Sequence, residues 1–221
     1  MNEVYCMDCM DYMRTLPDKA FDLAIVDPPY GINCAGGKIG NSCLAETKEY
    51  KKFFGDDKDA PDKSFFDELF RVSKNQIIWG ANHFISRFAK DASCWVVWDK
   101  ENGDTDFADC ELAWTSFKCA VRKYTFRWAG MLQGNMKDKE ERIHPTQKPV
   151  ALYKWLLAKF GGGGGYKVLD THVGSGSIRI ACDEMGYDFV GCEIDKYYWE
   201  AQEKRYADWK KGAGSQLQFE F

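Results

Sequence analysis

The sequence lacks several features that would assign it to particular classes of protein. Its longest apolar runs are far too short to cross a membrane, and its N-terminus does not show the basic and then apolar pattern of a secretory signal. Among its nine cysteines, Cys6 and Cys9 have the spacing of a metal or redox pair, but neither a second pair nor a histidine cluster accompanies them. We therefore expect a cytoplasmic protein with reduced cysteines, no membrane contact and no metal site.

The sequence also lacks a positive net charge. Its formal net charge of −4 argues against a protein that coats nucleic acid without selectivity. Residues 118–148 differ, because they contain eight Lys or Arg and three acidic residues, a local charge of 8 − 3 = +5. Tyr124, Phe126 and Trp128 are interleaved with these charges. Such a segment could follow a phosphate backbone and stack on bases, or it could be a solvated hairpin.

Strand and helix patterns alternate along the chain. Apolar or alternating runs predict strands at residues 4–7, 21–27, 76–79, 93–98, 109–115, 168–170 and 187–193. Apolar stripes at helical spacing predict helices at residues 10–16, 62–72, 149–160, 177–185 and 196–211. Residues 31–60 have no period, and we expect them to form a mobile functional lid. The alternation predicts an α/β fold with a mostly parallel sheet between two layers of helices.

The motif Asp27-Pro28-Pro29-Tyr30 directly follows the apolar strand at residues 21–26. The two prolines end the strand, because they cannot donate to a sheet and they fix the backbone. Open α/β sheets bind their ligands at the carboxyl ends of the strands. The motif therefore indicates a site with an acid, a rigid turn and an aromatic ring, although a proline-stopped strand with a buried tyrosine would give the same pattern.

A second candidate site begins at Asp170, the end of a predicted strand. Gly174 and Gly176 allow a ligand to approach the backbone closely, and a helix follows them. Glu193 ends the next strand, at the position that binds ribose hydroxyls in nucleotide-binding folds. The turn lacks the longer loop and lysine of phosphate sites, so a nucleoside without phosphates is favoured over ATP; ordinary tight turns are the alternative.

These motifs, together with His144-Pro145-Thr146-Gln147-Lys148-Pro149, occur in a characteristic order. The order resembles the beta group of DNA amino-methyltransferases, which methylate exocyclic nitrogens with S-adenosylmethionine. The resemblance covers residues 8–30, the strands around Trp79 and Trp98, and residues 144–205. It implies a Rossmann-like methyltransferase fold with a mostly parallel seven-stranded sheet, helices on both faces and circularly permuted motifs. Residues 1–118 would form the catalytic half, 119–143 a short target-recognition insertion, and 144–221 the cofactor-binding half of the same domain.

The resemblance also implies the roles of particular residues. Asp8 and Cys9 would contact the adenine end of the cofactor, Glu193 its ribose, and residues 146–148 its methionine end. His172 departs from the family, which usually has phenylalanine there. The expected cofactor site comprises Asp8, Cys9, Asp27, Thr146, Gln147, Lys148, Asp170, Thr171, His172, Gly174, Ser175, Gly176, Ser177, Glu193 and Ile194.

The catalytic residues are expected to be Asp27, Pro28, Pro29 and Tyr30. The lone pair of an aromatic amine is delocalised, so acceptors aimed at its two hydrogens would make the nitrogen more nucleophilic. The Asp27 carboxylate and the Pro28 carbonyl could accept these two hydrogen bonds, and Tyr30 could stack on a base that has left the helix. By resemblance, Asp at the first position favours adenine N6, and cytosine N4 is the alternative.

The basic residues 120–142 are the candidate for target recognition in double-stranded DNA. Arg122, Lys123, Arg127 and Lys137 would contact phosphates or bases. The segment is short, so a homodimer or residues 31–60 would supply more surface. The resemblance implies a modification enzyme of bacterial or phage origin, of the restriction–modification type, that acts at the nucleoid. Methylation of RNA, an inactive DNA-binding module, and methylation of a protein amide are alternatives; Asp27 argues against the last, since those enzymes carry asparagine there.

Overall fold

The computed structural model describes residues 1–32, 60–103, 108–129, 132–137 and 139–216. The predicted lid at residues 31–60 lies outside the described residues except at its two ends. In the described part of the chain, no helix is both long and apolar enough to cross a membrane.

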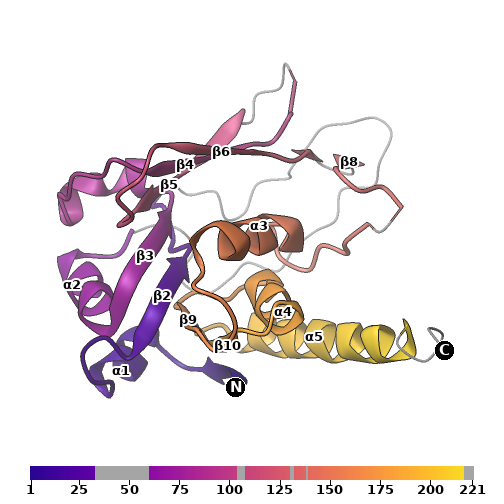
Figure 1. The fold of residues 1–221 in the computed structure, drawn as a ribbon. Coiled ribbons are helices and arrows are strands. Elements are labelled where there is room, and N and C mark those ends of the chain that lie inside the picture. Colours follow the sequence, from indigo (N-terminus) through magenta and orange to yellow (C-terminus); the bar gives the residue numbers. More distant parts are fainter. Residues whose placement is uncertain (33–59, 104–107, 130–131, 138, 217–221) are drawn as a thin grey trace.

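One large sheet forms the centre of the molecule (Figure 1). Its eight strands lie in the order β1 (Asn2–Cys6), β10 (Asp188–Glu193), β9 (Lys167–Asp170), β2 (Phe21–Val26), β3 (Ser73–Trp79), β5 (Cys110–Thr115), β4 (Trp95–Asp99) and β6 (Arg122–Thr125). Neighbouring strands are parallel except at β5, which runs antiparallel to both β3 and β4. The mostly parallel sheet predicted from the sequence is therefore confirmed.

The sheet has one strand more than the seven expected, and the additional strand is β6. It comes from the basic segment and pairs in parallel with β4, with Arg122 opposite Val96. Along β6, half-buried and exposed residues alternate, as expected for an edge strand with one covered face. The covered Tyr124 stacks on Trp155, with ring centroids 5.0 Å apart. The charged Arg122 on the half-buried face and the charged Lys123 on the open face concealed this alternation in the sequence.

Helices cover both faces of the sheet, because the strands are apolar on both sides. In β2, Leu23 and Ile25 pack in the core beneath α3 (Val150–Phe160) and α4 (Ser177–Glu184). The intervening Ala24 and Val26 pack in a second core beneath α1 (Cys9–Arg14) and α2 (Lys63–Val72). The long helix α5 (Lys196–Gln216) lies on the side of α4, where Trp199 Nε1 donates to the carbonyl of Val4 (Figure 1).

This topology brings three carboxylates to one edge of the sheet. β2, β9 and β10 are parallel neighbours, so the residues that end them or follow them, Asp27, Asp170 and Glu193, lie at the same edge. A short helical turn, η1 (Ala81–His83), follows β3 at this edge, and α1 begins beside it with Asp8 as its cap. The two candidate sites, at Asp27 and at Asp170, are 170 − 27 = 143 residues apart in the sequence but adjacent in space.

Candidate active site

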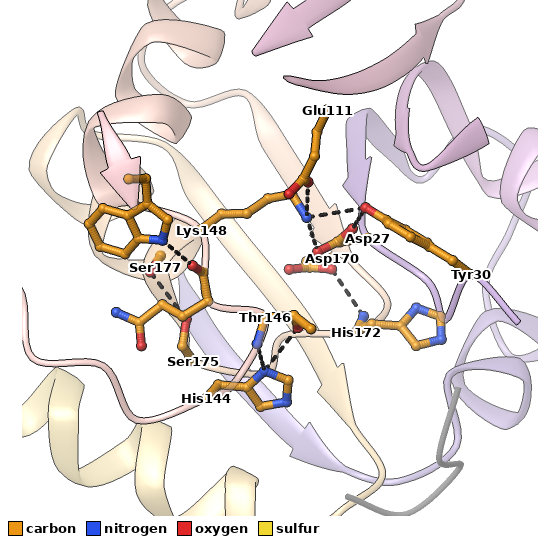
Figure 2. A network of polar contacts seen from close by, with 12 residues as sticks. Asp27, Tyr30, Glu111, His144, Thr146, Lys148, Asp170, His172, Ser175 and Ser177 are labelled. Atoms are coloured by element: carbon orange, nitrogen blue, oxygen red, sulfur yellow. Dashed lines mark hydrogen bonds and ion pairs between the residues drawn. The ribbon is translucent and has the colours of Figure 1, made fainter. Parts of the chain in front are cut away.

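Asp27 is held by two side chains, one of which the sequence did not predict. Tyr30 OH donates to Asp27 Oδ1 at 2.7 Å, and the Lys148 ammonium forms an ion pair with Asp27 Oδ2 (Figure 2). Lys148 Nζ also lies 3.3 Å from the hydroxyl of Tyr30. The side chain of Lys148 is only 3% exposed, so this cation is buried beside the predicted catalytic acid.

Lys148 has a second acidic partner, Glu111 in β5. Lys148 Nζ lies 3.1 Å from Glu111 Oε2, and Lys100 forms an ion pair with the other oxygen of Glu111. Burial disfavours the charged form of Glu111, but the two lysines outweigh it and lower its pKa to about 2. Burial also disfavours the ammonium of Lys148, yet Asp27 and Glu111 raise the pKa of Lys148 above its usual range. Glu111 and Lys148 are therefore both charged at neutral pH.

The ring of Tyr30 is fixed by the end of β3 and by η1. It stacks on His83, with centroids 5.2 Å apart and planes 18° apart. Gly80 leaves room for the ring, because a Cβ at this position would lie 2.1 Å from Tyr30 Cε1. Gly80 also has a φ of +66°, which favours glycine. Burial and the neighbouring Asp27 raise the pKa of Tyr30, so its hydroxyl remains a donor.

Asp170, the second carboxylate, has a different environment. Its Oδ1 accepts the backbone N–H of His172 at 3.0 Å (Figure 2). The His172 ring lies edge-on to Phe65. Thr171 Oγ1 lies 2.8 Å from His172 Nδ1, and burial lowers the pKa of His172 to about 4. Burial raises the pKa of Asp170 to about 8, with the His172 N–H opposing the shift and the carboxylates of Asp27 and Glu193 adding to it.

The glycine turn is tied to Glu193. Glu193 Oε2 accepts the N–H of Gly174 at 2.8 Å, and Oε1 accepts the N–H of Asp195 at 2.9 Å. Gly174 and Gly176 have φ values of +51° and +73°, so the turn depends on both glycines. Burial raises the pKa of Glu193.

Asp8 and Cys9 lie where β1 leads into α1, beside β10. Asp8 Oδ1 accepts the N–H of Met10 at 2.7 Å and caps the helix. Burial raises the pKa of Cys9 to about 12, so this residue is a thiol. Ile194 follows Glu193 and is 44% exposed.

Several side chains of the expected cofactor site have partners within the chain. The amide of Gln147 is used within its own loop, donating to the carbonyl of Glu141 and accepting from the N–H of Ile143. Lys148 points to Asp27 and Glu111, as described above, and its ammonium is fully engaged there. Thr146 is exposed and bonds to Nδ1 of His144 (Figure 2).

Ser175 and Ser177 hold the glycine turn from behind. Both are buried, their hydroxyls lie 3.1 Å apart, and Arg205 donates to the Ser175 carbonyl and to Ser177 Oγ. Arg205 also forms an ion pair with Glu140 at 2.7 Å, and Glu140 Oε1 accepts the N–H of Val150 at the start of α3. These contacts give Ser175 and Ser177 a part in supporting the turn.

The four predicted DNA-contacting residues lie along β6 and the hairpin that follows it, β7 (Trp128–Ala129) and β8 (Leu132–Gln133). Arg127 and Lys137 are exposed. Lys123 is also exposed but forms an ion pair with Asp99 in β4 at 2.7 Å, and Arg122 is half-buried. Arg127 and Lys137 are therefore better placed to meet a partner than Arg122 and Lys123. Among the described residues, no group of three or more His, Cys, Asp or Glu could hold a metal ion.

The known proteins that this chain resembles include DNA methylases and methyltransferases. A family model described as DNA methylase matches residues 73–204, more than half of the 221 residues. Type II methyltransferase M.HinfI from Haemophilus influenzae is 27% identical over an alignment that covers 93% of this chain and 68% of that protein. The M1.HpyAVI–SAM complex has a TM-score of 0.57 at 21% identity and covers 93% of this chain and 100% of that one. The cytosine-N4-specific PvuII DNA methyltransferase has a TM-score of 0.59 at 11% identity and covers 93% of this chain and 86% of that one.

The fold and the shared edge of the sheet define a methyltransferase of the Rossmann-like class. The chain belongs to the DNA methylase family, the beta group of the N6/N4 DNA amino-methyltransferases. The family depends on S-adenosylmethionine, so the cofactor predicted from the motifs is confirmed.

The residues at the site fit this cofactor. S-adenosylmethionine carries a sulfonium and an ammonium group, which suit an edge where three carboxylates converge and where burial leaves Asp170 with a raised pKa. Glu193 supplies carboxylate oxygens at the turn, the type of acceptor that ribose hydroxyls require. Asp170, Gly174, Gly176 and Glu193 would hold the cofactor there.

Proposed function

We propose that this protein methylates the exocyclic N6 of adenine in double-stranded DNA after the target base has left the helix. One observation carries the proposal: the carboxylate of Asp27 lies at the sheet edge that it shares with the glycine turn. A group bound at Asp27 and a group bound at Asp170 would therefore meet, because β2 and β9 are adjacent strands.

When bound, S-adenosylmethionine supplies an electrophilic methyl group. The chain's contribution is to orient the amine that receives it. Asp27 would accept one N–H of the amine and the carbonyl of Pro28 the other, which directs the nitrogen lone pair out of the base plane. Because Pro28 is buried and Pro29 fixes the backbone after it, the carbonyl is preorganised. The nitrogen would take the methyl group directly as the carbon–sulfur bond breaks and would then release a proton to water, so no covalent enzyme intermediate is required.

Adenine is preferred over cytosine because Asp27 opens the catalytic motif, which by family resemblance favours N6. Cytosine N4 is the second candidate, since the cytosine-N4-specific PvuII DNA methyltransferase shares the fold. An RNA amine is a third, less favoured substrate because the same acceptor pair would serve it. We further infer a modification enzyme of bacterial or phage origin acting at the nucleoid, as a homodimer if one target segment is too small for a whole recognition site.

The test is transfer from S-adenosylmethionine labelled in its methyl group to duplex DNA, to duplex RNA and to a protein lysate. The DNA arm is then digested to nucleosides, which are identified by mass spectrometry. N6-methyladenine from DNA is the expected product. N4-methylcytosine would establish the second candidate, and label found only in RNA or protein would refute the proposal. Light scattering with and without DNA measures the oligomeric state.

A further inference from the structure

We propose that Lys148, held by Glu111, is a positioning residue that holds the carboxylate of Asp27 in a fixed direction as a hydrogen-bond acceptor during methyl transfer. This inference rests on the proposed function, because it assigns Asp27 to the orientation of the target amine. It concerns the chain's own ion pair and assigns Lys148 a role different from cofactor binding.

The contacts of Lys148 lie within the chain, where its ammonium donates to Asp27 and Tyr30 and forms an ion pair with Glu111. A lysine ammonium has three N–H donors. Three oxygen atoms of the chain surround Lys148 Nζ: Asp27 Oδ2 in an ion pair, Glu111 Oε2 at 3.1 Å and Tyr30 OH at 3.3 Å. A cofactor carboxylate could bind Lys148 only by displacing one of these partners.

The surroundings of Lys148 exclude water. Its side chain is 3% exposed, and Nζ lies 5.4 Å from the ring centroid of Trp79 and 5.8 Å from that of Tyr30. A buried cation is stable only when it is paired. Glu111 is itself neutralised by Lys100, so the four groups form an alternating chain in which each charge faces an opposite charge. This arrangement fixes Lys148 independently of any substrate.

Lys148 leaves Asp27 able to bind an amine. A carboxylate has about four acceptor positions. Tyr30 uses one on Oδ1 and Lys148 one on Oδ2, so positions remain for an N–H of the substrate. Because Lys148 stabilises the charged form of Asp27, the carboxylate would serve as a hydrogen-bond acceptor and would not retain the proton that the methylated nitrogen loses.

Asp170 lies at the same edge of the sheet, and the donor to its carboxyl group is a backbone N–H. Burial raises its pKa to about 8. Asp27 faces negative and neutral groups as well as its lysine. Among the described residues, the titratable groups around Asp27 are Tyr30, Glu111, Lys148, Tyr153 and Asp170, of which only Lys148 is cationic. Without Lys148, the described groups around Asp27 would be acidic or neutral, and no cation among them would hold its carboxylate in direction.

The experiment compares wild type with Lys148→Met, Lys148→Arg and the control Lys154→Met, whose lysine forms a surface ion pair with Glu184. Single-turnover transfer is measured against pH, and the dissociation constant of S-adenosylmethionine is measured separately. In Lys148→Met the rate at pH 7 should fall by about tenfold or more, and the acid limb of the profile should move up by about one pH unit. Cofactor affinity should change by less than about threefold, and Lys148→Arg should keep the wild-type acid limb.

Two results would overturn the proposal. One is an unchanged acid limb in Lys148→Met. The other is a loss of cofactor affinity of about tenfold or more with an unchanged rate at saturation, which would make Lys148 a cofactor ligand. If wild type methylates DNA and Lys148→Met behaves like Lys154→Met, this inference fails while the proposed function stands.

A second variant addresses folding, because Lys148→Met leaves two buried acids without their shared cation. The double variant Lys148→Met/Glu111→Gln removes one positive and one negative charge. The negative charge of Glu111 is therefore no longer present when its partner Lys148 is absent. The double variant should fold and show the same displaced acid limb as Lys148→Met. Independently of activity, the carboxyl carbon of Asp27, assigned in labelled protein with Asp27→Asn, should titrate at higher pH in the double variant than in wild type. An identical titration in both proteins would contradict the proposal.

Discussion

Asp27 and Asp170 follow or end adjacent parallel strands, yet they are held in different ways. Asp27 pairs with a buried lysine and accepts a hydrogen bond from a tyrosine. Asp170 accepts a backbone N–H, and burial raises its pKa to about 8. Two carboxylates at one edge of a sheet therefore have different partners, an ammonium for Asp27 and a backbone N–H for Asp170.

The difference matches the two partners that the site must bind. A neutral amine needs an acceptor whose charge is already fixed, and Lys148 fixes that of Asp27. A cationic cofactor needs a negative charge that the protein has not already neutralised, and Asp170 can supply it by releasing a proton. The comparison of Asp27 with Asp170 indicates that the groups in contact with a carboxylate determine what it can bind more than its position in the sheet does.

The largest effect is expected from Asp27→Ala. Removal of the acceptor should lower single-turnover methyl transfer by about a thousandfold or more, equivalent to about 4 kcal/mol of barrier. Cofactor affinity should change by only about threefold, because Asp170 and Glu193 remain. Equilibrium binding and quench-flow measurements check both values. Rapid turnover by this variant would contradict the role of Asp27.

Asp170→Asn should have the opposite pattern. Affinity for S-adenosylmethionine should fall by about ten- to a hundredfold, and affinity for the uncharged thioether product should fall less. In wild type, affinity for the cationic cofactor should rise with pH from about 6 to 9, since ionised Asp170 favours it. The asparagine variant should lose this pH dependence. Equal losses for cation and thioether would remove charge as the explanation.

The raised pKa of Asp170 also predicts how stability depends on pH. Between the ordinary carboxyl pKa and about 8, the folded chain holds a proton that the unfolded chain has released. The contribution of this group therefore favours folding less as pH rises through that window. Urea denaturation should show a flatter pH dependence for Asp170→Asn than for wild type, with the largest gain in stability above pH 8. A parallel pH dependence in the two proteins would show that Asp170 does not titrate there.

Gly80→Ala should disturb the Asp27 side of the site and spare the Asp170 side. The new Cβ would meet Tyr30, and φ at this position is +66°. We expect a loss of about 2–4 kcal/mol in the free energy of unfolding, with slower transfer but nearly normal cofactor binding. Gly103→Ala is a matched control, since it has the same φ of +66° and no atom within 4 Å of the added Cβ. Equal losses in both variants would show that contact with Tyr30 is unimportant.

Arg127→Ala should have the smallest effect and should affect neither carboxylate. DNA affinity should fall severalfold. The slope of log affinity against log salt should decrease in magnitude by about one, as expected for the loss of one phosphate contact. Lys159→Ala, an exposed lysine at the end of α3, serves as the control. A salt slope that is the same in both variants would remove Arg127 from the DNA interface.

The sequence predicted the parts of the site that local patterns encode. The apolar strand before Asp27 and the glycines after Asp170 each follow from neighbouring residues, and their parallel alignment follows from the alternation of strands and helices. Because the carboxyl ends of parallel strands share an edge, the proximity of the two sites was predictable as well.

The partners of Asp27 were not predictable in the same way. Lys148 is 121 residues away, and Glu111 comes from β5, where it lies opposite Trp98 of β4. The motif that contains Lys148 suggested a ligand for the cofactor, because sequence spacing does not reveal the direction of a side chain. An acid within an otherwise apolar strand, as at Glu111, was the available signal for a buried ion pair. The same limit applies to Ser175, Ser177 and Gln147, whose partners come from distant segments or from their own loop.

The most direct test of the account is a structure of the protein with the thioether product of the cofactor and a duplex containing its target base. The account predicts that the exocyclic amino nitrogen lies within hydrogen-bond distance of the Asp27 carboxylate and the Pro28 carbonyl, while Lys148 still pairs with Asp27. A target amine bound elsewhere, with Asp27 turned away from the cavity that contains the glycine turn, would contradict it.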